Sequence, residues 1–257
     1  WDMAEGSGRD KKGSSGRSDR SKAGLTRQPK KMRGRKPSSQ RWLTRQLNDP
    51  FVAEAKKKGY RSRAAIKLEQ MDGKHKFLKP HMRVVDLGCA PGGWLQYVAR
   101  ECRLDAGKGC LVGIDLLETD PVSGADIMVG DINEEGVLEE VATRIGGKAD
   151  AVLSDMAAAT TGHRQTDHLR TMALLELALD FAGQILQPGG LFLAKAFRGG
   201  ADANFMKLLN ERFEKVRYLK PDASRAESVE TYLLATGFQP PENDETGEND
   251  LEAVAEN

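Results

Sequence analysis

The sequence VVDLGCAPGGW, which spans Val84–Trp94, sets the architecture of this 257-residue chain. A short β-branched run ends at Asp86, and a turn rich in glycine and proline follows before an apolar segment with helical spacing. The glycines remove Cβ atoms where the backbone must turn sharply and where a ligand must come close. We therefore expect a strand, a tight loop and a helix, with a ligand bound outside the carboxyl end of the strand.

The glycine spacing indicates which ligand this loop holds. A dinucleotide loop has the pattern G-x-G-x-x-G, whereas this chain has Gly88-x-x-x-Gly92-Gly93 preceded by Asp86. An acid at a strand end suits the ammonium group of S-adenosylmethionine better than a phosphate. Asp115 ends the next apolar run 22 positions after Gly93, close to the spacing of about 20 for a carboxylate that binds ribose hydroxyls. We therefore expect S-adenosylmethionine, held by Asp86, Gly88, Gly92, Gly93 and Asp115.

Composition narrows the class of protein. With 39% hydrophobic residues the chain can bury a sizeable core, and no apolar run approaches the roughly 18 residues of a membrane span. The three cysteines form no CxxC pair and the four histidines lack metal-ligand spacing. We therefore expect a cytoplasmic monomer without a disulfide framework, a metal or a membrane segment.

Charge is distributed unevenly along the chain. Residues 1–48 hold 14 Lys/Arg against four Asp/Glu, whereas residues 242–256 hold seven Asp/Glu and no Lys/Arg. Block polarity of this kind is typical of disordered tails, and a basic arm suits a phosphate-rich partner. We expect a disordered basic arm over residues 1–38, a folded domain with N-terminal helices over 39–238, and a disordered acidic tail over 239–257.

Strand and helix patterns alternate through the folded domain. Strands are expected at 84–87, 110–115, 126–130, 150–155, 191–196, 215–220 and 231–236, and helices at 51–58, 62–72, 93–104, 134–145, 170–186 and 204–212. This alternation predicts an α/β, doubly wound, Rossmann-like fold around a parallel sheet. The last two strands have no helix between them. We therefore expect a seven-stranded mixed sheet with an antiparallel edge strand.

Four charged residues lie in apolar surroundings, namely Lys67, Asp155, Lys195 and Glu230. The carboxyl ends of parallel strands gather beside the ligand loop, so Asp155 and Lys195 should face the same cleft as the methyl donor. A solvated strand-end charge or a structural ion pair would explain any one of these residues alone. For Asp155 with Lys195, the shared topology favours a functional role.

Several motifs in combination resemble the FtsJ/RrmJ family, ribosomal RNA large subunit methyltransferase E. They are Arg41–Leu43, Lys57–Leu68, Asp86–Trp94, Ser154–Ala157, Lys195–Phe197, Lys220–Arg225 and Glu230-x-Tyr232. The resemblance extends from Ser39 to Gly237, so the folded domain is expected to be the methyltransferase domain. It implies transfer of a methyl group from S-adenosylmethionine to the 2′-hydroxyl of a uridine in large-subunit (23S-type) ribosomal RNA.

The resemblance also implies roles for individual residues. It implies a catalytic tetrad of Lys67, Asp155, Lys195 and Glu230, and a donor site that includes Gly92, Trp94, Asp115, Asp131 and Asp155. A lysine accepts a proton only in its neutral form, so Lys195 either deprotonates the ribose hydroxyl or orients its oxygen. One departure lies beside the donor site, where Ala158-Ala159 replaces the Pro-Asn of the family.

Basic residues near the first helices form the expected RNA contact. A solvated helix face explains Lys56–Lys58 equally well on their own, but flanking arginines favour RNA. The predicted set is Arg41, Lys56, Lys57, Lys58, Arg61 and Arg63, with ribosomal RNA or the large ribosomal subunit as partner. Alternatives are a 2′-hydroxyl methyltransferase for transfer RNA or messenger RNA caps, a catalytically idle RNA-binding assembly factor, and a nicotinamide dehydrogenase, which the glycine spacing disfavours.

Overall fold

The computed structural model describes residues 40, 44, 47–104, 107–159, 161–197, 203–225 and 228–241. The chain divides into two compact units, Trp1–Asp49 and Pro50–Asn257. The second unit holds the sheet and the helices that surround it. The predicted basic arm at 1–38, Arg41, and the acidic tail from residue 242 lie outside the described residues.

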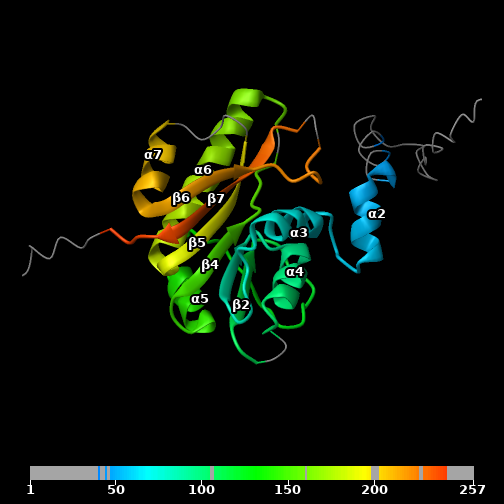
Figure 1. The fold of residues 1–257 in the computed structure, drawn as a ribbon. Coiled ribbons are helices and arrows are strands. Elements are labelled where there is room, and N and C mark those ends of the chain that lie inside the picture. Colours follow the sequence, from blue (N-terminus) through cyan, green and yellow to red (C-terminus); the bar gives the residue numbers. More distant parts are fainter. Residues whose placement is uncertain are drawn as a thin grey trace, which may run out of the picture. The chain divides into compact units, whose positions relative to one another are not determined.

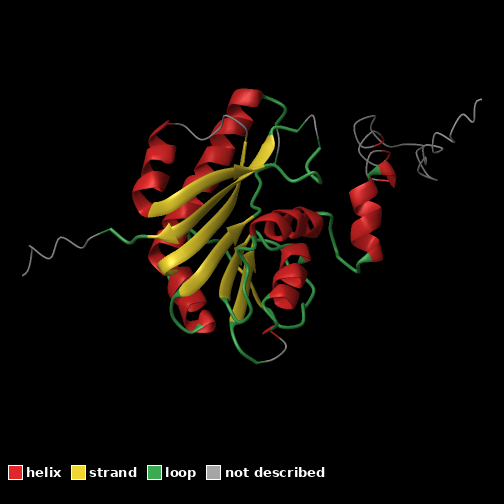
Figure 2. Cartoon of the chain, in the orientation of Figure 1, coloured by secondary structure: helices red, strands yellow, loops and turns green. Residues whose placement is uncertain are grey.

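A seven-stranded sheet forms the centre of the second unit, in the order β3-β2-β1-β4-β5-β7-β6 (Figures 1 and 2). The strands are β1 Arg83–Leu87, β2 Cys110–Asp115, β3 Asp126–Val129, β4 Ala149–Ser154, β5 Leu186–Phe197, β6 Phe213–Leu219 and β7 Glu230–Phe238. The first five strands pair in parallel, and β7 pairs antiparallel with both β5 and β6. The predicted fold class is confirmed; the strand of opposite direction is β7, and its partner β6 forms the edge.

Helices cover both faces of the sheet. Those that cover it are α3 Ala64–His75, α4 Gly93–Glu101, α5 Val137–Ile145, α6 Arg164–Ile185 and α7 Ala203–Arg212, whereas α2 Pro50–Lys57 contacts α3. Buried side chains of α5, α6 and α7 pack in one core, and those of α3 and α4 pack in a second core across the sheet. The strand order reverses between β1 and β4, which is the point where doubly wound sheets bind ligands.

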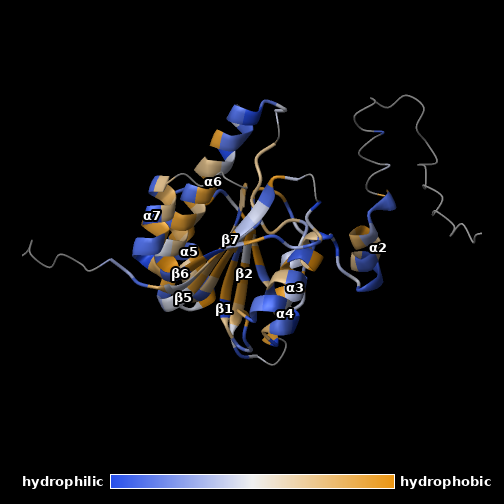
Figure 3. Cartoon of the chain, turned by 45° about the horizontal axis from the view of Figure 1, so that its top comes forward, coloured by the Kyte–Doolittle hydropathy of each residue, from blue (hydrophilic) through white to orange (hydrophobic). Residues whose placement is uncertain are grey.

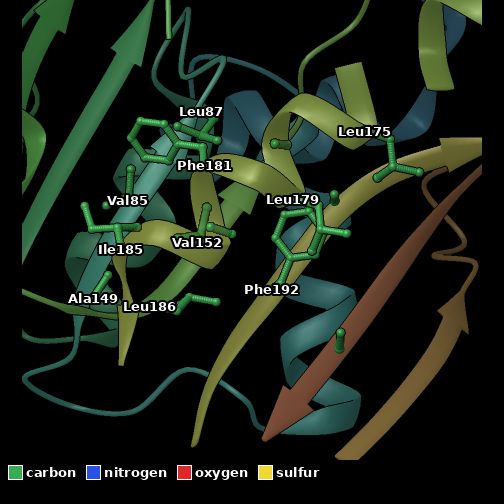
Figure 4. Packing of buried hydrophobic residues seen from close by; sticks show 14 of the residues in the cluster. Val85, Leu87, Ala149, Val152, Leu175, Leu179, Phe181, Ile185, Leu186 and Phe192 are labelled. Carbon is green, nitrogen blue, oxygen red and sulfur yellow. The ribbon is translucent and has the colours of Figure 1, made fainter. Parts of the chain in front are cut away.

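The central strands are apolar on both sides because helices cover both faces. In β1 every residue after Arg83 is buried, and the strands in the middle of Figure 3 are coloured hydrophobic along their length. Figure 4 shows Leu179 and Phe181 of α6 packed over Val152 and Phe192 of the sheet. Alternate residues of β1 face the opposite core, so Val84 packs with α3 and α4.

The long helix α6 begins at Arg164, six residues before the predicted start at Arg170. The ring of His163 caps it by accepting a hydrogen bond from the Thr166 amide. Asp167 in the first turn accepts hydrogen bonds from the amide and hydroxyl of Thr161. Histidine is not among the usual capping residues, so the sequence pattern did not mark this start. Within the described part of the chain, no helix combines the length and apolarity needed to cross a bilayer.

Candidate active site

The register of the sheet gathers the predicted catalytic residues on one face. Lys195 lies opposite Tyr232 and Phe197 lies opposite Glu230 in the β5–β7 pair. Alternation places Lys195 on the same face as Leu191 and Leu193, which pack in the core beneath α3. Helix α3 covers that face and contributes Lys67 from above. Asp155 directly follows β4, so all four residues of the predicted tetrad come together at the carboxyl end of the sheet.

Lys195 and Asp155 form the first of two ion pairs. Lys195 Nζ lies 2.7 Å from Asp155 Oδ1 and also donates to the Asp155 backbone carbonyl at 2.9 Å. The two side chains are 11% and 17% exposed, so solvent screens the pair only weakly. Asp155 therefore holds the ammonium group of Lys195 by two contacts.

Lys67 and Glu230 form the second ion pair. Lys67 Nζ lies 2.6 Å from Glu230 Oε1, and the Ser224 hydroxyl donates to the same oxygen at 2.7 Å. Burial by itself would raise the pKa of Glu230, but the charge of Lys67 and the two hydrogen bonds outweigh it and lower that pKa. Glu230 is therefore a stable anion that fixes the position of Lys67.

Tyr232 connects the two ion pairs, a role that the sequence prediction did not assign. Its hydroxyl donates to Asp155 Oδ1 at 2.9 Å and accepts from Lys67 Nζ at 3.4 Å. Burial, with the charges of Asp155 and Glu230, raises the pKa of Tyr232 well above its usual value, so the phenol stays protonated. The spacing Glu230-x-Tyr232 on a strand was the available signal, because residues two apart share a face.

A cleft of about 380 Å³ opens beside this network at the ends of β1, β2, β3 and β4. Of the predicted donor residues, Gly88, Asp115, Asp131 and Asp155 line it. Asp115 accepts hydrogen bonds from the amides of Ala90 and Leu117. Asp131 accepts from the amide and side chain of Asn133, and the amide bond is the main reason its pKa is lowered. The cleft thus presents fixed carboxylates at the ends of β2 and β3, whereas the charge of Asp155 is balanced by Lys195.

Asp86 lies deeper, at the end of β1. Its side chain is fully buried, and neither carboxyl oxygen has a hydrogen-bond partner among the described residues. Burial, followed by the nearby charges of Asp155 and Asp115, raises the pKa of Asp86 well above its usual value. A buried carboxyl without a partner is costly, and Asp86 is not among the residues that line the cleft, so its predicted contact with the donor stays a prediction.

These observations fit S-adenosylmethionine. The donor carries an ammonium group, a sulfonium and a ribose diol, all of which suit carboxylates. The residues that line the described cleft include three aspartates and no lysine or arginine. A dinucleotide would bring a pyrophosphate into this negative field, so the cleft disfavours the nicotinamide alternative. In the described residues, no group of three or more His, Cys, Asp or Glu side chains could hold a metal ion.

The glycines and the tryptophan of the loop after β1 are fixed by close packing, and Gly92, Gly93 and Trp94 do not line the cleft. A Cβ at Gly88 would lie 2.7 Å from Met156 Cγ, which explains the glycine where the loop meets the segment after β4. A Cβ at Gly93 would collide with Ser62, just before α3, and the Trp94 indole donates to the Ala64 carbonyl at 2.8 Å. Gly92 has φ +98° and lies against the Arg61 side chain. Gly92, Gly93 and Trp94 thus dock the loop on α3 and the residues before it.

The residues predicted to bind RNA are placed in different environments. Lys56 and Lys57 are exposed at the end of α2, whereas Lys58 pairs with Glu54 at 2.8 Å and with Glu69 at 2.9 Å. Arg61 donates to the carbonyls of Pro91, Asp120 and Pro121, so it ties the donor loop to the segment after β2. Arg63 directly precedes α3, and its positive charge opposes in part the rise in the pKa of Tyr232 that burial causes.

The segment that departs from the family pattern borders the cleft. Met156 and Ala157 line the cleft, and Ala158 and Ala159 follow as irregular backbone. Arg170 of α6 donates to the Ala159 carbonyl at 3.4 Å. This hydrogen bond from α6 to the backbone of Ala159 helps to position the segment, and it does not depend on the side chains at Ala158 and Ala159.

Comparison with known proteins identifies the family. A family model described as FtsJ-like methyltransferase matches residues 60–238. A relative from Parvibaculum lavamentivorans, named ribosomal RNA large subunit methyltransferase E, is 53% identical over 217 residues, which cover 82% of this chain and 85% of the relative. A relative of the same name from Xanthobacter autotrophicus is 54% identical over 210 residues, covering 82% and 83%.

A solved structure agrees with this result. The crystal structure of a Plasmodium falciparum protein described as a ribosomal RNA methyltransferase superposes with a TM-score of 0.62 at 31% identity, covering 70% of this chain and 98% of that one. The family resemblance carried by the sequence motifs is thereby confirmed. With the family model matching most of the folded residues and relatives more than half identical, this chain belongs to the FtsJ-like methyltransferase family.

Proposed function

We propose that the protein transfers the methyl group of S-adenosylmethionine to the 2′-hydroxyl of a uridine in large-subunit ribosomal RNA. The observation that carries the proposal is the hydrogen-bonded series Lys195–Asp155–Tyr232–Lys67–Glu230 at the edge of an acidic cleft. The names of the relatives support ribosomal RNA as the substrate. The resemblance stated above supports the uridine and its 2′-oxygen.

The chain supplies the donor site through Asp115 and Asp131, which line the cleft, with Asp86 buried behind the cleft at the end of β1. When bound, S-adenosylmethionine supplies a methyl group already activated by the positive sulfur. The fixed carboxylates orient the ammonium and ribose of such a ligand without rearrangement, because backbone amides or Asn133 already hold Asp115 and Asp131. Orientation of this kind is a major source of rate enhancement in a displacement reaction.

Lys195 acts on the ribose hydroxyl in this proposal. An ammonium group has three donor directions, and Asp155 occupies two of them, so one remains for the 2′-oxygen. The bound donor would supply the methyl carbon to the 2′-oxygen and keep the bonding electrons on its sulfur, and the hydroxyl proton would leave through Lys195 in its neutral form or pass to solvent while Lys195 orients the oxygen. Asp155 and Tyr232 hold Lys195 in position in either case.

Lys67 and Glu230 complete the site from the α3 side. Their pair lies next to the Tyr232 hydroxyl, so Lys67 can place positive charge near the reacting ribose while Glu230 fixes its position. This arrangement distinguishes an enzyme from an idle RNA-binding factor, because binding alone needs no buried pair of lysine–carboxylate couples. Burying such couples carries a desolvation cost that function must justify.

The experiment that tests the proposal presents the full chain with methyl-labelled S-adenosylmethionine and three separate acceptors. These are large ribosomal subunits, transfer RNA and capped messenger RNA. The proposal expects label on the large subunit, in a fragment that resists alkaline cleavage because its 2′-oxygen is methylated. Label on transfer RNA or on the cap would move the activity to another RNA. No label on any acceptor, with RNA binding intact, would favour the assembly factor.

A further inference from the structure

A basic groove lies between the end of α3 and the edge strand β6. It consists of two adjoining hollows of about 390 Å³ each, which share His75 and Arg217 in their walls. We call this surface the α3–β6 groove, and its basic residues are Lys74, His75, Lys76, Lys215, Arg217 and Lys220. Neither hollow includes a residue of the predicted tetrad or of the predicted RNA-binding set.

The strand pattern explains why β6 turns its charges into this groove. Leu219 is buried in the core under α3, and residues two and four positions earlier share its face. Those residues are Arg217 and Lys215, and both are exposed. Val216, on the other face of β6, packs against the core that contains Phe205 and Leu209 of α7, so α7 lies on the side away from Lys215 and Arg217.

The end of α3 supplies the opposite wall. Lys74 and His75 occupy its last turn, and Lys76 follows in a left-handed conformation with φ 53° and ψ 45°. Glycine is the residue that adopts this conformation at least cost. A lysine at this position therefore keeps its charge beside the groove at some conformational expense.

The charges of the groove are not neutralised within the described chain. The side chains of Lys74, Lys76, Lys215 and Arg217 form no hydrogen bond or ion pair with another described residue. Asp150 is the one acid among the lining residues, and it accepts hydrogen bonds from the Arg83 amide and the Gln187 side chain. Burial is the main reason that the pKa of His75 is lowered, and the positive charges of Lys74 and Arg217 lower it further.

Two ordinary explanations each account for one wall only. Basic residues in the last turn of a helix interact favourably with its dipole, which would explain Lys74. Charged residues on an edge strand prevent pairing with a second sheet, which would explain Lys215 and Arg217. Neither explanation requires the two walls to face each other across one hollow, where their repulsion is unfavourable unless an anion joins them.

The groove leads away from the catalytic network. In the β6–β7 pair, Leu219 lies opposite Tyr232, Arg217 opposite Leu234 and Lys215 opposite Thr236. At about 3.3 Å per residue, Arg217 and Lys215 are therefore about 7 and 13 Å along the strand from Tyr232. Lys220, at the near end, donates to the Glu230 carbonyl at 2.6 Å. A chain of phosphates leaving the active site would meet these cations in succession.

We propose that the α3–β6 groove binds the phosphodiester backbone of the RNA substrate beyond the methylated nucleotide. The inference rests on the proposed function for the identity of the RNA, but its contacts are independent of the methyl-transfer step. The ligand chemistry is a row of phosphates, because the groove offers separate cations spaced along a strand.

The test measures binding of deproteinised large-subunit ribosomal RNA to the full chain over a range of salt concentrations. The variant Lys215→Gln/Arg217→Gln should bind the RNA about tenfold or more weakly at 0.1 M salt, and the salt slope of log K should fall by about two. The matched control is Lys108→Gln/Lys207→Gln, which removes the same charge from two exposed sites elsewhere. The control should bind like the parent.

A second variant separates binding from folding. Lys76→Gly removes one charge and relieves the left-handed conformation, so it should weaken RNA binding without lowering the melting temperature.

Groove variants that bind RNA like the control would overturn the proposal. If they instead dimerise with unchanged RNA affinity, edge protection is the role of these residues. Methyl transfer is scored separately, so a parent that binds RNA through the groove but methylates none would contradict only the proposed function.

Discussion

The hydroxyl of Tyr232 donates a hydrogen bond to Asp155 Oδ1 over 2.9 Å, and the same oxygen receives Lys195 Nζ at 2.7 Å. Tyr232 therefore holds the carboxylate of Asp155 in place, and Asp155 in turn positions Lys195. Its ring packs 5.8 Å from the ring of Trp94, which is docked on α3. One buried phenol thus connects the donor loop, the helix that carries Lys67 and the strand that carries Lys195.

Tyr232→Phe tests this positioning role. The ring keeps its packing while Asp155 loses one hydrogen bond and gains freedom to turn, so kcat should fall roughly 10- to 100-fold. Donor affinity should stay close to that of the parent, because Tyr232 does not line the donor cleft. Single-turnover methyl transfer with saturating donor and RNA measures the change. A parental rate would show that Asp155 needs no support from the phenol.

The buried pair Lys67–Glu230 should respond differently to single and double substitution. Lys67→Met leaves an unpaired buried carboxylate and should cost about 3–5 kcal/mol of unfolding free energy, whereas Lys67→Met/Glu230→Met should regain most of that loss. Both variants should be inactive. Urea unfolding and methyl transfer measured together decide the matter. If the double variant were as unstable as the single one, the Lys67–Glu230 pair would stabilise the fold by more than the neutralisation of each charge by the other.

The same pair should make the free energy of unfolding fall at acidic pH. The pKa of Glu230 is lower in the folded than in the unfolded chain, so its contribution is complete above the unfolded value and is lost as pH falls through the folded value. The Lys67→Met/Glu230→Met variant should lack this part of the acid dependence.

Asp86 should show the opposite dependence on pH. Its folded pKa is raised by burial, so ionisation favours the unfolded chain as pH rises above the unfolded value of about 3.9. Asp86→Asn removes this penalty and should be more stable than the parent at neutral pH, while it binds S-adenosylmethionine weakly. Unfolding curves at several pH values and donor titration by calorimetry measure the two effects. Lower stability combined with normal donor binding would contradict a ligand role for Asp86.

Arg61 is expected to act through the fold as much as through RNA. Its guanidinium donates to three backbone carbonyls, so Arg61→Gln should lose about 1–3 kcal/mol of stability and weaken donor binding. Lys57→Gln is the matched control, because that side chain is exposed on α2 and its loss should leave stability unchanged. An Arg61→Gln variant with parental stability and reduced RNA affinity would restore the role predicted from sequence.

Much of the fold could be predicted from the sequence because its signals are local. The apolar run of β2 ended where it was expected, at Asp115, and glycine and proline marked the turn after β1. The meeting of Asp155 and Lys195 followed from one rule, that parallel strands present their carboxyl ends at the same edge. These features depend on periodicity and strand direction alone.

Features that depend on contacts between distant residues could not be predicted in the same way. Tyr232 lies in an apolar strand and looks like a core residue until Asp155, 77 positions away, is placed beside it. The carbonyl partners of Arg61 lie 30 to 60 positions along the chain and carry no side-chain pattern. The position of β7 between β5 and β6 likewise depends on which strands pair with one another, and hydrophobic periodicity does not show this.

The central claim is that Lys195 acts on a ribose hydroxyl at the edge of the donor cleft. The most direct measurement compares the parent with Lys195→Ala, using labelled donor and large ribosomal subunits, and maps the methylated position in the RNA. The account predicts one 2′-O-methylated uridine with the parent, no label with Lys195→Ala, and donor binding by both. Normal turnover by Lys195→Ala, or label on a base instead of a ribose, would contradict it.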